Sequence, residues 1–218
     1  KAVAKKATKK KAVAKKRATK KKAVAKKATR KAVTKKRATK KKAAGKKAPA
    51  KRAAPALPDP EVRPAPEVGD MAPDFTLPAD DGTEVSLESL RGKTVVLFFY
   101  PKDNTPGCTT EACNFRDINE ELLEKDVQVI GVSRDSVKSH ARFKDKQSLN
   151  FPLLSDPEGE MISAYGAWGP KVFMGRKFDG ILRSTVIIDP EGRVAKVYPK
   201  VSVKTHADEV LADLEEMA

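Results

Sequence analysis

The sequence predicts an α/β fold in which helices flank a mixed central sheet, with a disordered basic tail in front of it. Three observations lead to this prediction. Apolar runs of strand length alternate with helical patterns from about residue 75 onward. One of these runs, TVVLFFY at 94–100, is β-branched and aromatic throughout, as in a central strand buried on both faces. Residues 1–52, by contrast, contain no acidic side chain at all.

The basic tail is built from repeats. It holds 26 of the 45 Lys and Arg residues of the 218-residue chain, so the remainder has 19 basic and 29 acidic residues. Variants of the motif KAVAKK begin at Lys1, Lys11, Lys22, Lys31 and Lys42. Such a segment buries too little apolar surface to offset its ordering entropy, and its charges repel one another. Residues 1–52 are therefore predicted to be disordered.

A cationic run of this length is a ligand for polyanions, because each neutralised phosphate releases counterions. The tail resembles the Lys/Ala-rich tails of linker histones in composition, and without interleaved aromatics its DNA binding should be independent of sequence. The expected DNA contacts are Lys5, Lys6, Lys15, Lys16, Arg17, Lys26, Lys27, Lys35, Lys36, Arg37, Lys46 and Lys47. The alternative is a solvated charge run that acts on solubility alone.

The expected location is the cytoplasm, in association with the nucleoid, or the nucleus in a eukaryote. No stretch reaches the roughly 18 apolar residues of a membrane span, and the tail has no apolar face to hold it on a membrane. A transit peptide would be rich in Arg and Ser, whereas this tail is dominated by Lys and has no Ser.

The Pro content separates the tail from a folded domain. Six prolines between residues 49 and 66 indicate a semi-rigid linker with polyproline character. We therefore assign residues 53–67 to a linker and 68–218 to one domain, which is an ordinary domain size.

Within the domain the elements follow in order. Strands are expected at 75–77, 84–87, 94–100, 127–133, 184–189 and 194–198, and helices at 106–125, 136–148, 158–166 and 205–217. The turn signal ADDGT makes the first two strands a hairpin, and PEGR does the same for the last two. Strand–helix–strand followed by a hairpin and a helix implies a mixed sheet.

Both cysteines of the chain lie in the stretch YPKDNTPGCTTEACNFRD at 100–117. Thr105 suits the N-cap of the predicted helix and Pro106 its first position, so Cys108 falls in the first turn. There the unpaired N–H groups and the helix dipole favour the thiolate, which is the nucleophilic form of Cys. The alternative is an inert Cys packed under the strand.

The spacing of the two thiols suggests a cycle rather than a structural cross-link. Residues five apart on a helix have Cα atoms about 8.7 Å apart, whereas a disulfide needs about 7 Å or less. Cys108 and Cys113 can therefore join only if the helix unwinds locally. A metal site is not expected, because His140 and His206 are distant and there is no further Cys.

Five other conspicuous residues receive structural interpretations. His140 and His206 fall in charge-rich helices and are expected to be solvated. Glu111 is read as ordinary matching of an acidic side chain to the helix dipole, with tuning of Cys108, one turn earlier, as the alternative. Tyr165 and Trp168 are expected to pack or to lie in loops, with contact to substrate as the alternative.

The cysteine stretch resembles the active site of peroxiredoxins, whose pattern Pro-x-x-x-Thr-x-x-Cys is met by Pro101, Thr105 and Cys108. The second Cys five residues later is similar to the Q-type peroxiredoxins, or bacterioferritin comigratory proteins. The resemblance continues in FPLLSD at 151–156, YGAWGPK at 165–171 and GILRSTVIIDPEGRV at 180–194. It implies a thioredoxin-like fold for about residues 68–218 and does not extend to the tail.

The resemblance also implies site residues and partners. Cys108 would attack a hydroperoxide, Thr105 would hydrogen-bond the peroxide and the sulfur, and Pro101 would shield the pocket. Arg183 would favour the thiolate, and Cys113 would form a redox disulfide with Cys108. No metal or other cofactor is implied. The substrate would be hydrogen peroxide or an organic hydroperoxide, and the reductant would be a thioredoxin-like protein. We expect the chain to be a monomer.

Two other functions remain open from the sequence. One is a structural nucleoid protein with an incidental peroxidase domain, which DNA compaction by the Cys108→Ser variant would favour. The other is a disulfide oxidoreductase or thiol chaperone, which the rate of oxidation by peroxide would decide.

Overall fold

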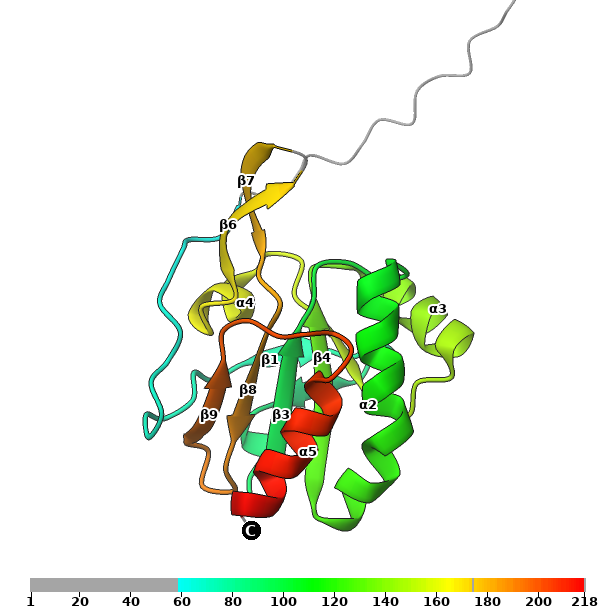
Figure 1. Cartoon of the computed structure of the whole chain (residues 1–218), viewed down its shortest axis with the longest axis vertical. Coiled ribbons are helices and arrows are strands. Elements are labelled where there is room, and N and C mark those ends of the chain that lie inside the picture. The colour runs from blue at the N-terminus through cyan, green and yellow to red at the C-terminus, as the bar shows by residue number, and fades with distance from the viewer. Residues whose placement is uncertain (1–58, 174, 218) are drawn as a thin grey trace, which may run out of the picture. The chain divides into compact units, whose positions relative to one another are not determined.

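The computed structural model describes residues 59–173 and 175–217. The predicted disordered tail, 1–52, and the first part of the predicted linker, 53–58, lie outside the described residues. Figure 1 shows the described chain as a sheet with helices packed against it.

The central sheet is mixed, as predicted. Its strands are β3 (Thr94–Phe99), β4 (Val127–Ser133), β5 (Leu153–Ser155), β8 (Ser184–Ile188) and β9 (Val194–Tyr198). Their order is β5-β4-β3-β8-β9, in which β3, β4 and β5 are parallel while β8 runs antiparallel to both β3 and β9. β3 and β4 therefore end at the same edge of the sheet.

Helices lie against this sheet. They are α2 (Pro106–Glu124), α3 (Val137–Gln147), α4 (Glu160–Ala164) and α5 (His206–Met217), with a short 3-10 turn, η1 (Glu88–Leu90). α2 and α5 lie across one face of the sheet, with α3 beside α2 (Figure 1). The four helices predicted from the sequence are all present, with ends shifted by no more than one or two residues.

The strand β3 divides the core into two clusters. Val95, Leu97 and Phe99 contact the cluster that includes Tyr165 and α4. The alternate residues Val96 and Phe98 contact the cluster under α2 and α5. Successive residues of a strand point to opposite faces, so a strand covered on both sides must be apolar throughout.

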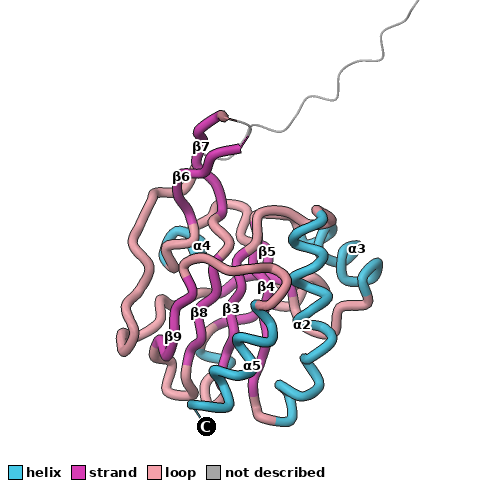
Figure 2. Tube along the Cα trace, viewed as in Figure 1, coloured by secondary structure: helices cyan, strands magenta, loops and turns pink. Residues whose placement is uncertain are grey.

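Two hairpins lie outside the central sheet. β1 (Thr76–Pro78) pairs with β2 (Glu84–Ser86), as predicted. β6 (Trp168–Phe173) pairs with β7 (Arg176–Ile181) and projects beyond the end of the sheet (Figure 2). β6 and β7 were not predicted, because the exposed stretch RKFD lacks apolar alternation. The three-residue strand β5 was not predicted either.

Part of the predicted linker contacts the domain. Ser163 donates a hydrogen bond to the carbonyl oxygen of Glu61. Gly166 has a positive φ of 67°, and a Cβ there would overlap the backbone of Ala65. Residues 61–65 therefore pack beside α4, while the boundary between linker and domain at 67/68 stays a prediction.

The prediction that the two histidines are solvated is wrong. His140 is fully buried and His206 is 1% exposed. His140 lies within hydrogen-bond distance of Asp103, and Nε2 of His206 lies 2.7 Å from the hydroxyl of Thr185. Each sits on the one side of an otherwise charged helix that faces the core. Tyr165 and Trp168 are buried, which confirms the expectation that they pack.

Across the described residues, no helix combines the length and apolarity that crossing a membrane requires.

Candidate active site

The sheet topology brings two distant segments to one edge. The chain leaves β3 at Phe99, and the loop that follows leads into α2. Phe99 is paired with Ser184 at the start of β8. Because these strands are antiparallel, Arg183 lies at the same edge as the loop at 100–105.

The start of α2 positions Cys108 in the first helical turn. Thr105 occupies the N-cap position with an extended backbone, and Pro106 follows at the first helical position, as predicted. The Thr105 hydroxyl, however, makes no capping bond and instead donates to the carbonyl oxygen of Lys102 at 3.0 Å. With its proton engaged there, the Thr105 oxygen retains lone pairs that can accept a hydrogen bond.

Cys108 is a free thiol with 1% of its surface exposed. It belongs to the apolar cluster under α2, as an inert core Cys would. Yet Nη2 of Arg183 donates to its sulfur at 3.3 Å. A contact between a guanidinium and a sulfur in the first turn of a helix is one that an inert packing Cys does not require.

Arg183 is held on its other side by Glu111. Nη1 of Arg183 contacts Oε2 of Glu111, which is itself 1% exposed. Burial alone would lower the pKa of Arg183, but the charges of Glu111 and Cys108 raise it. The guanidinium is therefore a fixed cation shared between a carboxylate and a thiol.

The interpretation of Glu111 as ordinary dipole matching is wrong. Burial raises its pKa to about 7, although Arg183 acts in the opposite direction. Its second oxygen, Oε1, has no hydrogen-bond partner among the described residues. The signal was available in the sequence, because Glu111 lies on the same helical stripe as Cys108, Ala112 and Phe115, all of which are buried.

Gly107 leaves room for the guanidinium. A Cβ at this position would lie 3.3 Å from Nη2 of Arg183, which is closer than an ordinary contact. The absence of a side chain between Pro106 and Cys108 thus allows Arg183 to reach the sulfur.

Lys171 is a further cation near the site that the sequence analysis did not single out, although it ends the stretch YGAWGPK. Its ammonium donates to the carbonyl oxygen of Ile181 at 2.7 Å. Burial and the like charge of Arg183 lower the pKa of Lys171, while Cys108 acts in the opposite direction. Lys171 lines an open pocket of about 490 Å³ together with Pro101, Trp168 and Phe178. This pocket adjoins the loop that precedes Cys108.

A buried polar network holds that loop. Asp103 accepts hydrogen bonds from Tyr100 at 2.8 Å and from Ser139 of α3 at 2.6 Å, and lies 3.1 Å from Nδ1 of His140. Burial tends to raise the pKa of Asp103, but His140 and Ser139 lower it overall. The ionised carboxylate therefore ties the loop between β3 and α2 to the neighbouring helix.

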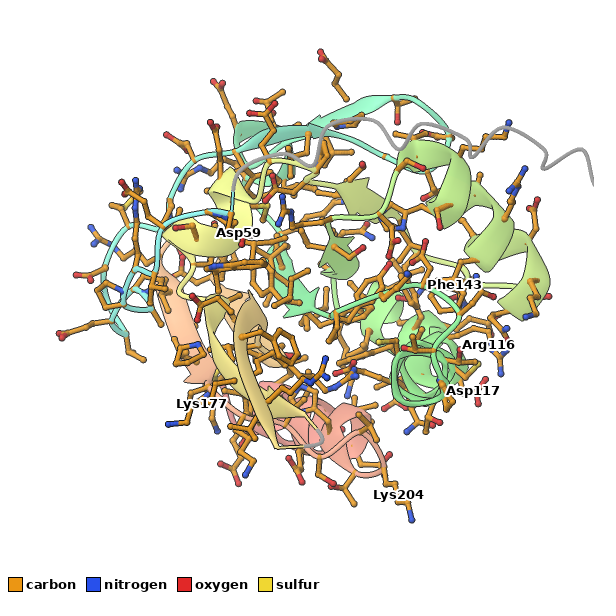
Figure 3. The ribbon with its side chains drawn as sticks, turned by 90° about the horizontal axis from the view of Figure 1, so that it is seen from above. Asp59, Arg116, Asp117, Phe143, Lys177 and Lys204 are labelled. Carbon is orange, nitrogen blue, oxygen red and sulfur yellow. The ribbon has the colours of Figure 1, made fainter. Side chains whose placement is uncertain are left out.

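Cys113 has different surroundings on the same helix. It is a half-buried free thiol, and Nη1 of Arg116 lies 3.6 Å from its sulfur. Its Sγ is also 3.9 Å from Oε1 of Gln147, at the end of α3. Figure 3 looks along α2 and shows Arg116 and Asp117 projecting from it, with Phe143 between α2 and α3.

The structure thus brings Cys108 and Arg183 into contact and places Pro101 and Thr105 on the loop beside them. Cys113 is on the same continuous helix but faces α3. The expected DNA contacts lie outside the described residues; they are Lys5, Lys6, Lys15, Lys16, Arg17, Lys26, Lys27, Lys35, Lys36, Arg37, Lys46 and Lys47.

Several known proteins are similar to this chain in sequence and fold. The AhpC/TSA family matches residues 68–197. Peroxiredoxin Bcp of Bacillus subtilis is 49% identical over 152 residues, which are 70% of this chain and 97% of that protein. The bacterioferritin comigratory protein of Xanthomonas campestris matches with a TM-score of 0.63 and 41% identity, over 66% of this chain and 91% of that one. PrxQ of Xylella fastidiosa matches with a TM-score of 0.66 and 36% identity, over 69% of this chain and 96% of that one.

Proposed function

The chain belongs to the AhpC/TSA family as a peroxiredoxin of the Q or Bcp type, a thiol-dependent peroxidase, and from this premise we propose that Cys108 is the sulfur that attacks the hydroperoxide. The observation that carries the proposal is the 3.3 Å contact between Arg183 and Cys108 in the first turn of α2. Arg183 favours the thiolate and stabilises the charge that moves onto the peroxide oxygens.

In the first step the Cys108 thiolate attacks one peroxide oxygen. A sulfur–oxygen bond forms, the oxygen–oxygen bond breaks, and the other oxygen takes a proton and leaves as water or an alcohol. The sulfur loses two electrons and becomes sulfenic acid. Thr105 has lone pairs to accept a hydrogen bond from the incoming peroxide, and Pro101 shields the sulfur from water.

In the second step Cys113 resolves the sulfenic acid. The first turns of α2 unwind, Cys113 attacks the sulfur of Cys108, and a disulfide forms with release of water. A thioredoxin-like dithiol then reduces the disulfide by exchange. The substrates are hydrogen peroxide and organic hydroperoxides, and the enzyme works as a monomer in the cytoplasm.

Stopped-flow fluorescence of Trp168 tests this order of events. Trp168 is the single tryptophan of the chain, is buried, and lines the pocket that contains Pro101. Mixing the reduced protein with peroxide should give one phase whose rate rises with peroxide concentration and a second that is independent of it. Cys108→Ser should show neither phase, and Cys113→Ser the first alone. A peroxide-dependent phase in Cys108→Ser would contradict the proposal.

The basic segment adds a second element to the proposal. Residues 1–52 carry 26 positive charges and no acidic side chain, whereas the remainder has an excess of acidic residues. We infer that the segment holds the peroxidase on DNA and so associates it with the nucleoid, where it would lower the local hydroperoxide concentration. Ten phosphate contacts would give a log–log salt slope of about −9.

Deletion of residues 1–52 tests the tether separately from the chemistry. The shortened protein should keep the peroxidase turnover of the full chain and lose retention on DNA at low salt. Equal retention of both proteins would contradict the tether, and a large loss of turnover would contradict its independence from catalysis.

A further inference from the structure

The contacts of Cys113 point to a role for Arg116 that the peroxidase chemistry described above does not include. We propose that Arg116 is a further catalytic residue, which activates the Cys113 thiol for its attack on the oxidised Cys108. The proposal rests on the proposed function, because it concerns the resolving step of that cycle.

The guanidinium of Arg116 is held in one orientation. Nε and Nη2 donate to Oδ1 of Asp117 at 2.8 and 2.6 Å, and Nη1 donates to the carbonyl oxygen of Gln147 at 2.7 Å. The same Nη1 lies 3.6 Å from the sulfur of Cys113. These bonds anchor the Arg116 side chain to its neighbour Asp117 and to α3. The Cys113 sulfur lies within hydrogen-bonding distance of Nη1.

Charge near Cys113 favours the reactive form of this thiol. A thiol must ionise before it attacks, and a cation in contact with the sulfur stabilises the ion. The hydrogen bonds that Arg116 donates to Asp117 raise the pKa of Arg116 and outweigh the lowering by burial, so the residue stays cationic. On the facing helix, Lys146 is directed to the side-chain oxygen of Asn104 at 3.2 Å.

The location of Arg116 also suits a step that involves unwinding. Arg116 is one turn beyond Cys113, and its anchors, Asp117 and Gln147, are outside the first two turns of α2. Unwinding that begins at Pro106 therefore frees Cys113 to turn toward Cys108 while the guanidinium remains held.

The chemical step balances without another reagent. The Cys113 thiolate attacks the sulfur of the Cys108 sulfenic acid, forming the sulfur–sulfur bond and breaking the sulfur–oxygen bond. The leaving oxygen takes one proton in addition to its own and departs as water. Before the helix unwinds, the Arg116 guanidinium lies 3.6 Å from the Cys113 sulfur and supplies a positive charge beside it.

The test compares Arg116→Gln and Arg116→Lys with Arg142→Gln, a control at an exposed arginine of α3. In stopped-flow experiments with hydrogen peroxide, the peroxide-dependent phase should stay within twofold of wild type in all three variants. The second phase should slow about tenfold in Arg116→Gln, less than for loss of a fully buried catalytic donor. It should recover in part in Arg116→Lys and in part at higher pH, where thiols ionise without help.

Slower resolution should also leave more sulfenic acid exposed to a second peroxide. Mass spectrometry at high peroxide should therefore find more sulfinic acid at Cys108 in Arg116→Gln than in the Arg142→Gln control.

The outcomes separate the two levels of the proposal. Equal second-phase rates in wild type and Arg116→Gln would overturn the role of Arg116, provided the disulfide forms in both. A slow phase that neither lysine nor alkaline pH restores would also overturn it, because a structural defect would explain the loss. A second phase that persists in Cys113→Ser would instead overturn the proposed function.

Discussion

Cys108 is buried against the sheet in the first turn of α2, whereas Cys113, five residues later, is half-buried and faces α3. Each thiol has an arginine beside it. The arginine at Cys108 comes from 75 residues further along the chain, and the one at Cys113 from three residues further along.

The two arginines come from different parts of the chain, and this difference matches the different reactions of the two thiols. Arg183 is placed by the pairing of β3 with β8, so its position depends on the whole sheet. Arg116 is placed by the helix and by one carbonyl oxygen at the end of α3. Peroxide attack requires a fixed arrangement of charges, whereas resolution requires movement. The first is built on tertiary structure, and the second on a helix whose first turns can unwind while Arg116 stays anchored to Asp117 and Gln147.

The largest expected effect comes from removing the arginine fixed by the sheet. Arg183→Met should slow the peroxide-dependent phase by about 10² to 10³, the usual loss when one preorganised donor is removed. The peroxide-independent phase should change little, because Cys113 does not contact Arg183. Stopped-flow fluorescence measures both phases, with Arg142→Met as the matched control. Equal slowing of both phases would show that Arg183 affects the reaction of Cys113 as well as that of Cys108.

The second effect is a dependence of stability on pH that arises on the Cys108 side. Burial raises the pKa of Glu111 from its ordinary value of 4.5 to about 7. A carboxyl whose pKa is raised by folding contributes its full stabilisation below pH 4.5 and loses it as the pH rises through 7. Relative to Glu111→Gln, the wild-type protein should lose about 2 kcal/mol of unfolding free energy between about pH 5 and pH 8.

Urea unfolding of both reduced proteins across this range measures the loss. Glu120→Gln, at an exposed position of the same helix, serves as the control and should follow the wild-type curve. If Glu111→Gln also follows the wild-type curve, Glu111 does not ionise in this range and the arrangement around Arg183 has a different charge from the one described.

The smallest expected effect comes from adding a single carbon atom beside Arg183. Gly107→Ala places a Cβ 3.3 Å from Nη2 of Arg183 and should displace the guanidinium by a few tenths of an ångström. The peroxide-dependent phase should slow by a few-fold, while helix propensity favours Ala over Gly by up to about 1 kcal/mol. Stability should therefore rise as reactivity falls. A variant that gains stability with unchanged reactivity would show that Arg183 tolerates the shift.

Much of the fold was predictable because its elements carry strong local signals. The β-branched and aromatic run at 94–100 predicted a strand covered on both faces, and Thr105 with Pro106 marked the start of α2. β5 was missed because its three residues, unlike those of β1 and β2, are not joined to a partner strand by a turn signal. The β6–β7 hairpin was missed because it pairs only with itself among the described strands. Pairing of that kind depends on backbone geometry that the side-chain pattern does not record.

The candidate site was predictable in part. The resemblance to peroxiredoxins led to Cys108, Thr105 and Arg183, and the first-turn position of Cys108 followed from the residues before it. Glu111 was interpreted as matching the helix dipole because an acidic residue early in a helix is ordinary, although its helical stripe is buried. His140 was predicted to be solvated because its helix is rich in charged residues. Its buried partner, Asp103, comes from a loop 37 residues earlier in the chain.

Amide hydrogen exchange on α2, before and after one equivalent of hydrogen peroxide, tests most directly whether Cys108 reaches Cys113 by unwinding of the helix. In the reduced protein the amides of 109–124 should be protected. With the disulfide between Cys108 and Cys113 verified by mass spectrometry, we expect loss of protection near residues 109–114 and retained protection at 116–124. A disulfide that forms while the first turns stay protected, or a Cys108 that remains reduced, would contradict it.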